Sequence, residues 1–455
     1  MGDSSLNKIE LVKEYILEKI KQGKITEGQR LSGCRELALK LSINKITVNR
    51  AYKLLEEEHI VYCVPRGGYY LIGNDTEDEI LPKDVDFRTI KPDSTLIPYK
   101  AFTHAINRTI EEHKKMLFQY EAPLGLMNLR ETLKGRFEIS GVYAKSSQIM
   151  ITNGAQQGIY LALKTLFSTH SDHKLLVEIP TYSLIPDMAR NLNIECIGIK
   201  RDSNGIDLEE LEAIFRKEAV KAFYVIPRHH NPTGYSLTEK NKRKIAELCY
   251  RYRVSLIEDD YLAELATDKR TLPLHYYDTH QLTFYIRSFS KTFIPGIRIG
   301  AMVIPETFCN SVMKQKHLLD LSTSSLPQGA LDFFIKSGMY DQHIRKVNAC
   351  YKRKLSKAKE ILTRMSPPGL SFFVPKQGLF LWLTLPSQVS IDTIADKLAQ
   401  HNIRIRSSAM NCITDKSNQN ISLCISGVPE NDLNALRIVL KVIKNELQLN
   451  PITIS

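Results

Sequence analysis

The sequence predicts two folds in one chain, a small α+β winged helix-turn-helix over residues 1–73 and a larger α/β domain over 87–455. Three observations support this prediction. The first seventy residues show three helical patterns followed by two short β-prone runs. Residues 74–86 are acidic and weakly apolar, which is typical of a solvated linker. Beyond the linker, helical and strand patterns alternate, which indicates a mainly parallel sheet with helices on both faces.

The composition is that of an ordinary globular protein. The chain has 455 residues, long enough for two or three domains, and is 43% hydrophobic and 25% charged. No apolar run approaches the roughly 18 residues that a membrane span needs, and Met1–Ile9 has no apolar export signal. The eight cysteines are scattered without a CxxC pair, which favours a reducing cytoplasm. A net charge of +12 favours an anionic partner.

Hydrophobic spacing predicts the elements of the N-terminal module. Apolar residues recur with a helical period over Leu6–Lys21. Ser32 is placed to cap a second helix that ends at Leu41, and a third helix is expected over Ile46–Glu58. Ile60–Ile72 then holds two β-prone runs around a Gly-Gly turn. Three helices and a two-stranded wing make a winged helix-turn-helix.

Basic residues gather where the recognition helix of such a module meets DNA. Six basic residues and a single acid lie between Arg30 and Lys53, so the positive charge coincides with the second and third helices. A helical packing domain with a solvated basic face is the alternative, but motif order and charge placement agree on DNA. The residues predicted to reach phosphates or base edges are Arg35, Lys45, Thr47, Asn49, Arg50 and, at the tip of the wing, Arg66.

The same segment resembles the GntR-type DNA-binding domain. That family's pattern reads leucine, proline, serine, any residue, arginine, then Glu-Leu-Ala, and it stands here as Leu31–Ala38. Ser32 replaces the proline and Gly33 the serine, which loosens the entry to the second helix without removing the domain. Thr47–Tyr52 matches well. The resemblance implies double-stranded promoter DNA as a partner.

One lysine of the larger domain, Lys291, lies between two hydroxyls inside the apolar segment Ser288–Gly300. Burial disfavours an ammonium ion and lowers its pKa, which makes a lysine a nucleophile toward aldehydes. Ser288 and Arg298 offer a hydroxyl and a guanidinium fork, the groups that hold a phosphate. Pyridoxal 5'-phosphate presents both an aldehyde and a phosphate, so Lys291 is the candidate catalytic residue. A surface lysine before a strand is the alternative.

Further candidates follow the carboxyl ends of predicted strands, where open α/β sheets bind ligands. Thr152–Gln157 ends a strand and opens a helix whose free N–H groups form a phosphate site. Tyr182 offers an aromatic face to a planar ring, and Asn231 a donor to a phenolate-type oxygen. The strand Ser255–Tyr261 ends in acids, one of which could keep a pyridine nitrogen protonated. A core tyrosine, a turn and solvated acids are the ordinary explanations of these three motifs.

The adjacent histidines His229 and His230 suggest a metal ion at first sight. No carboxylate or cysteine stands near them at the spacing of a metal site. We therefore predict no metal.

Taken together, these motifs appear in the order and approximate spacing of class I aminotransferases, over roughly Phe87–Leu440. The resemblance implies a fold-type I domain for pyridoxal 5'-phosphate, with a smaller C-terminal α/β subdomain at roughly 340–455. Lys291 would hold the cofactor as a Schiff base. The implied ring contacts are Tyr182, Asn231, Asp259 and Tyr261, and the implied phosphate contacts are Ala155, Gln156, Ser288 and Arg298. Asp259 is chosen over Asp260 because in similar chains the acid lies two residues before the tyrosine.

Another segment bears on assembly. Tyr120, followed by Gly125 and Leu129–Arg130, resembles a stretch that reaches across the aminotransferase dimer to the partner's phosphate. The resemblance thus implies a homodimer, which also suits DNA sites with two half-sites.

One departure from the aminotransferase pattern argues against productive transamination of ordinary α-amino acids. Enzymes of this class usually clamp the substrate carboxylate with an arginine near the C-terminus. The matching strand here is Ile421–Ser426, and Ser422 stands in the arginine's place. Arg404 and Arg406, on an earlier strand, could substitute for it.

A GntR-type winged helix joined to an aminotransferase-like domain is the architecture of the MocR family of bacterial regulators, the GabR-like group. The resemblance implies a transcription regulator that senses a small amine or amino acid, or pyridoxal 5'-phosphate itself, through a Lys291 aldimine. The alternative is a functional aminotransferase with an appended DNA-binding domain. A repressor with the cofactor as its only ligand is a second alternative. A DNA-packaging protein leaves the residues around Lys291 unexplained.

Overall fold

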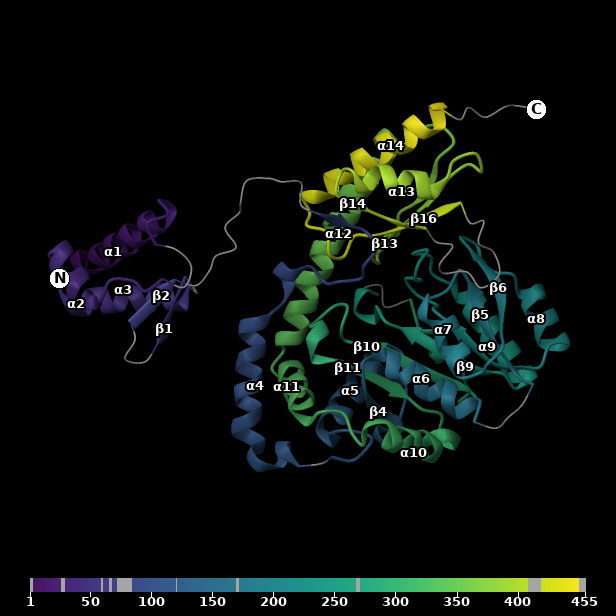
Figure 1. Cartoon of the computed structure of the whole chain (residues 1–455). Coiled ribbons are helices and arrows are strands. Elements are labelled where there is room, and N and C mark those ends of the chain that lie inside the picture. The colour runs from purple at the N-terminus through teal and green to yellow at the C-terminus, as the bar shows by residue number, and fades with distance from the viewer. Residues whose placement is uncertain are drawn as a thin grey trace. The chain divides into compact units, whose positions relative to one another are not determined.

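The structure is a computed structural model, and it divides into two compact units, Met1–Pro82 and Lys83–Ser455, which we describe separately (Figure 1). The residues that it describes are 3–25, 29–58, 60–64, 68–71, 84–119, 121–168, 172–266, 271–407 and 419–449. No helix among these residues is long and apolar enough to cross a membrane.

The first unit is the predicted winged helix-turn-helix. Its elements are α1 (Asp3–Lys21), α2 (Cys34–Leu41), α3 (Lys45–Glu57) and the antiparallel strands β1 (Val61–Val64) and β2 (Gly68–Leu71). Val12, Val48 and Leu55 are fully buried in its core. The Tyr52 ring of α3 stacks on Tyr69 of β2 with 4.6 Å between the ring centroids, which ties the recognition helix to the wing.

The predicted cap of the second helix is wrong. Helix α2 begins at Cys34, with Gly33 as a cap residue that makes no side-chain hydrogen bond. Ser32 lies one residue too far from the free N–H groups, and its hydroxyl instead bonds to Glu36 at 3.3 Å. The next helix, α3, does have a side-chain cap, because Asn44 Oδ1 accepts from the Ile46 N–H at 2.9 Å.

The second unit is built on an eight-stranded sheet of order β4-β11-β10-β9-β8-β5-β6-β7. Strands β10, β9, β8, β5 and β6 pair in parallel, whereas β11 and β7 are antiparallel to their neighbours, so the predicted mainly parallel sheet is confirmed. The strands are β4 (Ile149–Asn153), β5 (Lys174–Ile179), β6 (Cys196–Asp202), β7 (Gly205–Ile206), β8 (Val220–Val225), β9 (Ser255–Asp260), β10 (Thr283–Ser288) and β11 (Ile299–Val303).

Helices cover both faces of this sheet because alternate residues of its strands point to opposite sides. In β10, Phe284 and Ile286 belong to the apolar cluster that holds α6, α7 and α10, whereas Tyr285 belongs to the cluster of α4, α5 and α11. Helices α8 and α9 cover the far end of that second face. The helices are α4 (Tyr99–His113), α5 (Met127–Ile139), α6 (Ala155–Leu166), α7 (Leu184–Asn191), α8 (Leu208–Lys217), α9 (Glu239–Tyr252), α10 (Cys309–Asp320) and α11 (Ser325–Lys336).

A smaller subdomain follows the long helix α12 (Met339–Met365) and is drawn in light green and yellow in Figure 1. Its antiparallel sheet has the order β12-β13-β16-β15. Its elements are β12 (Ser371–Phe373), β13 (Phe380–Thr384), α13 (Ile391–Ala399), β14 (Ile403–Arg404), β15 (Arg406–Ser407), β16 (Asn420–Cys424) and α14 (Ala435–Leu449).

The start of the second unit is part of this subdomain. Strand β3 (Val85–Asp86) pairs in parallel with β14, and Val85 and Phe87 are buried in the subdomain's apolar core. Residues about 300 positions apart in the sequence are therefore neighbours here, which no local pattern indicated.

Candidate functional site

Nine of the predicted residues line one cavity of about 90 Å³ in the second unit. They come from the carboxyl ends of strands of the large sheet and from the segments that follow these strands. The nine are Ala155, Gln156, Tyr182, Asn231, Asp259, Tyr261, Ser288, Lys291 and Arg298, and the lining is completed by Ile90, Ile159 and Ser290. Tyr120, the tenth predicted cofactor contact, lies outside the described residues.

The turn between β4 and α6 forms one wall of this cavity. Gly154 has a φ of 76° and is the N-cap of α6, so the free N–H groups and the positive end of the helix dipole lie at the cavity. β11 packs tightly on this turn, because a Cβ atom at Gly300 would stand 2.6 Å from the Gly154 carbonyl carbon. Arg298 lies beside the same turn, within contact of Gly154. This arrangement suits an anion, because the N-terminus of α6, the Arg298 guanidinium and the nearby Ser288 hydroxyl can all donate hydrogen bonds to it.

Lys291 follows β10 and projects into the cavity beside Asp259 and Arg298. Its Nζ donates a long hydrogen bond of 3.4 Å to the Ile90 carbonyl. Burial lowers the pKa of the Lys291 amine below its ordinary value, and the positive charge of Arg298 lowers it further. A neutral, nucleophilic amine is therefore more accessible at Lys291 than at a surface lysine.

Asp259 presents an unsatisfied oxygen within this buried site. Its Oδ2 accepts a 2.8 Å hydrogen bond from the Tyr224 hydroxyl. Its Oδ1 is buried without a hydrogen-bond partner among the described residues. Burial raises the pKa of Asp259 to about 7. An orphaned carboxylate oxygen of this kind suits a protonated ring nitrogen, so the residues present fit pyridoxal 5'-phosphate.

The neighbouring acid, Asp260, has a different environment. Its carboxylate pairs with the Arg228 guanidinium and accepts a 2.6 Å hydrogen bond from the Tyr285 hydroxyl. These partners hold the pKa of Asp260 below its ordinary value despite its burial. Of the two carboxylates, only Asp259 lines the cavity.

A buried polar network holds the loop that carries Asn231. His230 lies between Glu178, with 3.2 Å from Nε2 to Oε2, and Thr233, with 2.9 Å from Nδ1 to Oγ1. The Tyr261 hydroxyl donates to the His229 carbonyl at 2.7 Å, so its own proton is engaged by this loop. The two histidines thus have structural partners around the cavity.

Four residues at the site were not predicted, and Ile159 of α6 is one of them. Tyr224 orients Asp259, but a tyrosine inside a buried strand carries no signal in the sequence. Ile90 comes just after the linker and faces Lys291. Ser290 lines the cavity and precedes Lys291 directly, so this neighbour could have been named from the lysine motif.

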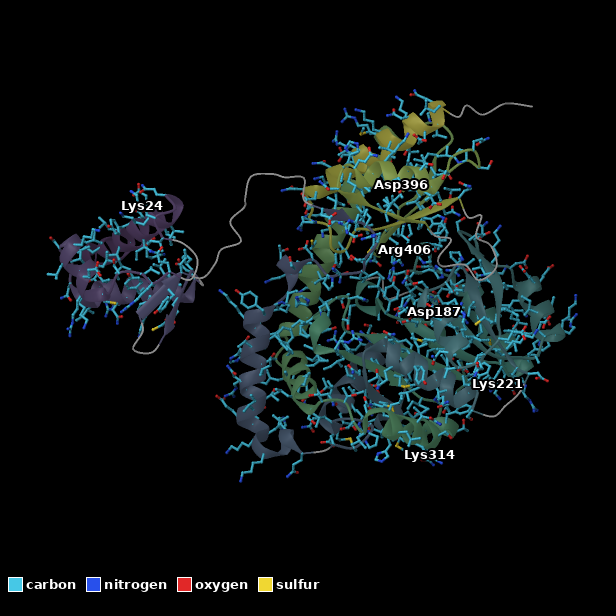
Figure 2. The ribbon with its side chains drawn as sticks, viewed as in Figure 1. Lys24, Asp187, Lys221, Lys314, Asp396 and Arg406 are labelled. Carbon is cyan, nitrogen blue, oxygen red and sulfur yellow. The ribbon has the colours of Figure 1, made fainter. Side chains whose placement is uncertain are left out.

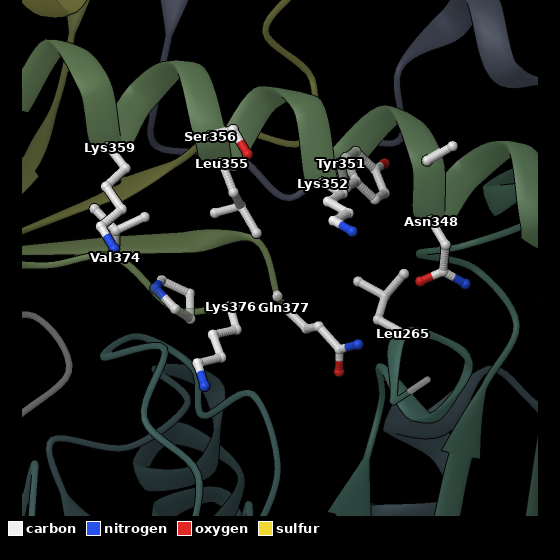
Figure 3. A pocket seen from close by; sticks show the side chains of 13 residues that line it. Leu265, Asn348, Tyr351, Lys352, Leu355, Ser356, Lys359, Val374, Lys376 and Gln377 are labelled. Carbon is white, nitrogen blue, oxygen red and sulfur yellow. The ribbon is translucent and has the colours of Figure 1, made fainter. Parts of the chain in front are cut away.

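This unit also holds larger cavities, of which two differ in their relation to the site. One of about 330 Å³ shares Ile90, Tyr182, Asn231 and Lys291 with the cavity just described. The other, of about 610 Å³, lies between α12 and residues 374–378, and Figure 3 shows its lysines along the helix and the facing loop. None of the predicted site residues lines this second cavity.

In the first unit, the predicted DNA contacts lie on α2 and α3. Arg35, Lys45, Asn49 and Arg50 are exposed, and Thr47 is half-buried. Val48 and Leu55 of the same helix are buried, so α3 has one apolar face and one polar face. Arg66 lies outside the described residues.

Both units match families of known proteins. Residues 8–71 match the model for bacterial regulatory proteins of the gntR family, and residues 92–438 match the model for aminotransferase class I and II. The HTH-type transcriptional regulator YcxD of Bacillus subtilis is 33% identical over 92% of this chain and 95% of its own length. The HTH-type transcriptional regulator NorG of Staphylococcus aureus is 26% identical over 78% of this chain and 86% of its own length.

Solved structures share the fold of the second unit. The kynurenine aminotransferase of Pyrococcus horikoshii aligns with a TM-score of 0.74 at 23% identity, over 80% of this chain and 92% of that one. The multiple substrate aminotransferase of Thermococcus profundus aligns with a TM-score of 0.75 at 24% identity, over 83% and 97%.

Proposed function

This chain belongs to the MocR-like HTH-type transcriptional regulators, in which a gntR-family domain precedes an aminotransferase class I and II domain, and we propose that it senses a small amine or amino acid. Its cofactor is pyridoxal 5'-phosphate. In this proposal, the winged helix binds promoter DNA in the cytoplasm, and the second unit responds to the amine or amino acid. The proposal rests on one observation: Lys291, Asp259 and the start of α6 line the same cavity.

When bound, pyridoxal 5'-phosphate supplies an aldehyde that reacts with amines and a protonated ring nitrogen that withdraws electrons. In the proposal, Lys291 would hold the cofactor through its aldehyde, the same group with which an amine ligand reacts. Asp259 would hold the ring nitrogen's proton through its free oxygen, and Tyr182 would cover the ring. Asn231 and Tyr261 would lie at the phenolic oxygen. Ala155, Gln156, Ser288 and Arg298 would hold the phosphate.

We favour a sensor over a full aminotransferase because of Ser422. Its hydroxyl donates a 2.9 Å hydrogen bond to the Pro232 carbonyl, so this side chain holds the Asn231 loop and offers no charge to a substrate. The functional aminotransferase with a DNA-binding domain remains the second candidate, since the fold and the lysine are those of the enzymes. We further propose a homodimer, whose two winged helices suit paired half-sites.

The test is the visible absorption spectrum of the cofactor-loaded protein, titrated with amines and amino acids. A sensor gives a spectrum that one class of ligand changes and that then stays constant, and the same ligand changes the mobility of a bound promoter fragment. Conversion to the pyridoxamine form, reversed by a keto acid, would instead identify an aminotransferase. Lys291→Ala is expected to abolish the starting band, because the side chain that condenses with the aldehyde is gone.

A further inference from the structure

The cavity of about 330 Å³ extends the Lys291 site toward the small subdomain. It shares four lining residues with the cofactor cavity, so a ligand whose amine meets Lys291 has the rest of its body here. The remaining lining comes from residues 87–89, from the start of α7, and from β13, β15 and β16, and it includes Arg88, Arg406 and Ser422. None of the described residues that line it is acidic.

The two arginines of this cavity differ in their partners. Arg88 is engaged by Asp86, with 2.9 Å from Nε to Oδ1 and 2.9 Å from Nη2 to Oδ2. Arg406 has no hydrogen bond or ion pair with the part of the chain that the structure describes, although it is half-buried. A half-buried guanidinium that has no counter-ion among the described residues, in a cavity whose described lining holds no acid, is a site for an anionic group.

The strand register explains why Arg406 rather than another arginine has this position. Arg406 of β15 stands directly opposite Ser422 of β16 in the antiparallel pair, so the two residues share one face of the sheet. Arg404, two residues earlier on β14, is exposed and pairs with Asp84 at 2.7 Å. Figure 2 labels Arg406 where the small subdomain meets the elements of the large sheet.

We propose that Arg406 selects the ligand by binding its carboxylate, so that the effector is an amino acid and not a simple amine. This assignment rests on the proposed function, because it takes the ligand's amine to lie at Lys291. The planar fork of a guanidinium binds a carboxylate through two parallel hydrogen bonds. The carboxylate would thus be bound from β15, on the strand opposite the β16 position from which the aminotransferases bind it and which Ser422 occupies here.

The test compares pairs of ligands that differ by one carboxylate: L-alanine with ethylamine, γ-aminobutyrate with n-propylamine, and L-ornithine with putrescine. Full-length, cofactor-loaded protein is titrated and its visible spectrum followed. For the pair whose skeleton fits, the amino acid is expected to bind about tenfold to a hundredfold more tightly, which is the range for a charge-assisted pair. Equal binding of both members in every pair that changes the spectrum would overturn the assignment while leaving the proposed sensor intact.

Variants sharpen the test. Arg406→Gln is expected to reduce the affinity for the amino acid to that for its amine, and Arg406→Lys to restore part of the preference. Arg404→Gln removes the same charge two residues away, where the side chain pairs with Asp84, and is expected to bind like the unmodified protein. A preference that survives Arg406→Gln would contradict the assignment. A spectrum that no ligand changes would contradict the proposed function and this assignment with it.

Discussion

At the scale of single residues, the two neighbouring acids at the end of β9 show what a sequence motif can predict and what it cannot. The sequence indicated that one acid of the pair serves a ring nitrogen, and it named Asp259 by its distance from Tyr261. The different environments of the two carboxylates come from Tyr224 on β8 and from Arg228 after it. Those contacts depend on the register between strands, so no spacing within β9 could predict them.

Asp259→Asn is expected to stabilise the cofactor-free protein more at pH 8 than at pH 5. Burial raises the pKa of Asp259 to about 7, from 3.8. The folded state therefore keeps a proton that the unfolded state has released, and stability falls as the pH rises from about 4 to 7. At pH 8 the raised pKa of Asp259 lowers the free energy of unfolding by about 4 kcal/mol, whereas at pH 5 it lowers it by only about 2 kcal/mol. Urea unfolding at both pH values measures the difference.

Asp260→Asn is the matched comparison for this measurement. Because Asp260 is paired with Arg228 in a buried environment, its loss leaves an uncompensated charge and is expected to destabilise the protein by about 3–5 kcal/mol. If Asp259→Asn changed stability equally at pH 5 and pH 8, the raised pKa of Asp259 would be contradicted.

At the scale of elements, the periodic segments were predicted well and the joints between them were not. The alternating helical and strand patterns after the linker are helices and strands of the structure, among them α6 (Ala155–Leu166) and β5 (Lys174–Ile179). The cap at Ser32 failed because one residue decides whether a side chain reaches a helix N–H. The pairing of β3 with β14 was missed because both strands have two residues, too few for any pattern.

Gly300→Ala is expected to weaken cofactor binding by about fivefold to a hundredfold, through the turn between β4 and α6. The added Cβ would lie 2.6 Å from the Gly154 carbonyl carbon and 2.7 Å from the Ala155 nitrogen, both backbone atoms, so the helix N-terminus must move away. Such overpacking costs about 1–3 kcal/mol. Gly296→Ala is the control, because a Cβ there meets nothing within 4 Å. The cofactor affinities of both variants are measured by titrating their apoproteins. Equal affinities would contradict the prediction, because they would show that the turn tolerates displacement.

At the scale of the whole molecule, charge is the property that the sequence conveyed most directly. The net charge of +12 indicated an anionic partner, and its position on α2 and α3 indicated which surface meets that partner. The identity of the cofactor was also within reach, because several short motifs agreed in order. The size and charge of the ligand cavity could not be predicted from the sequence, since the cavity is enclosed by segments between Phe87 and Ser422 that only the folded chain brings together.

Arg50→Ala is expected to weaken binding to a promoter fragment and to lower the slope of log affinity against log salt concentration by about one. Arg50 is exposed on α3, where it can reach a phosphate. Lys24→Ala removes an equal charge just after α1 and is expected to leave the slope almost unchanged. Mobility-shift titrations at several salt concentrations measure both. Equal slopes for the two variants would place the DNA on another surface.

The short strand β3 has a mechanical consequence. The Val85 and Phe87 N–H groups bond to the Asn402 and Arg404 carbonyls, and the Cys424 N–H bonds to the Phe87 carbonyl. The start of the second unit is therefore anchored in the small subdomain, and Arg404, whose carbonyl accepts one of these bonds, lies two residues before Arg406. In the proposed sensor, a ligand bound by Arg406 would act on the same subdomain that holds β3. In the proposed dimer, a shift at β3 would change the effective concentration of the second DNA-binding unit at its half-site.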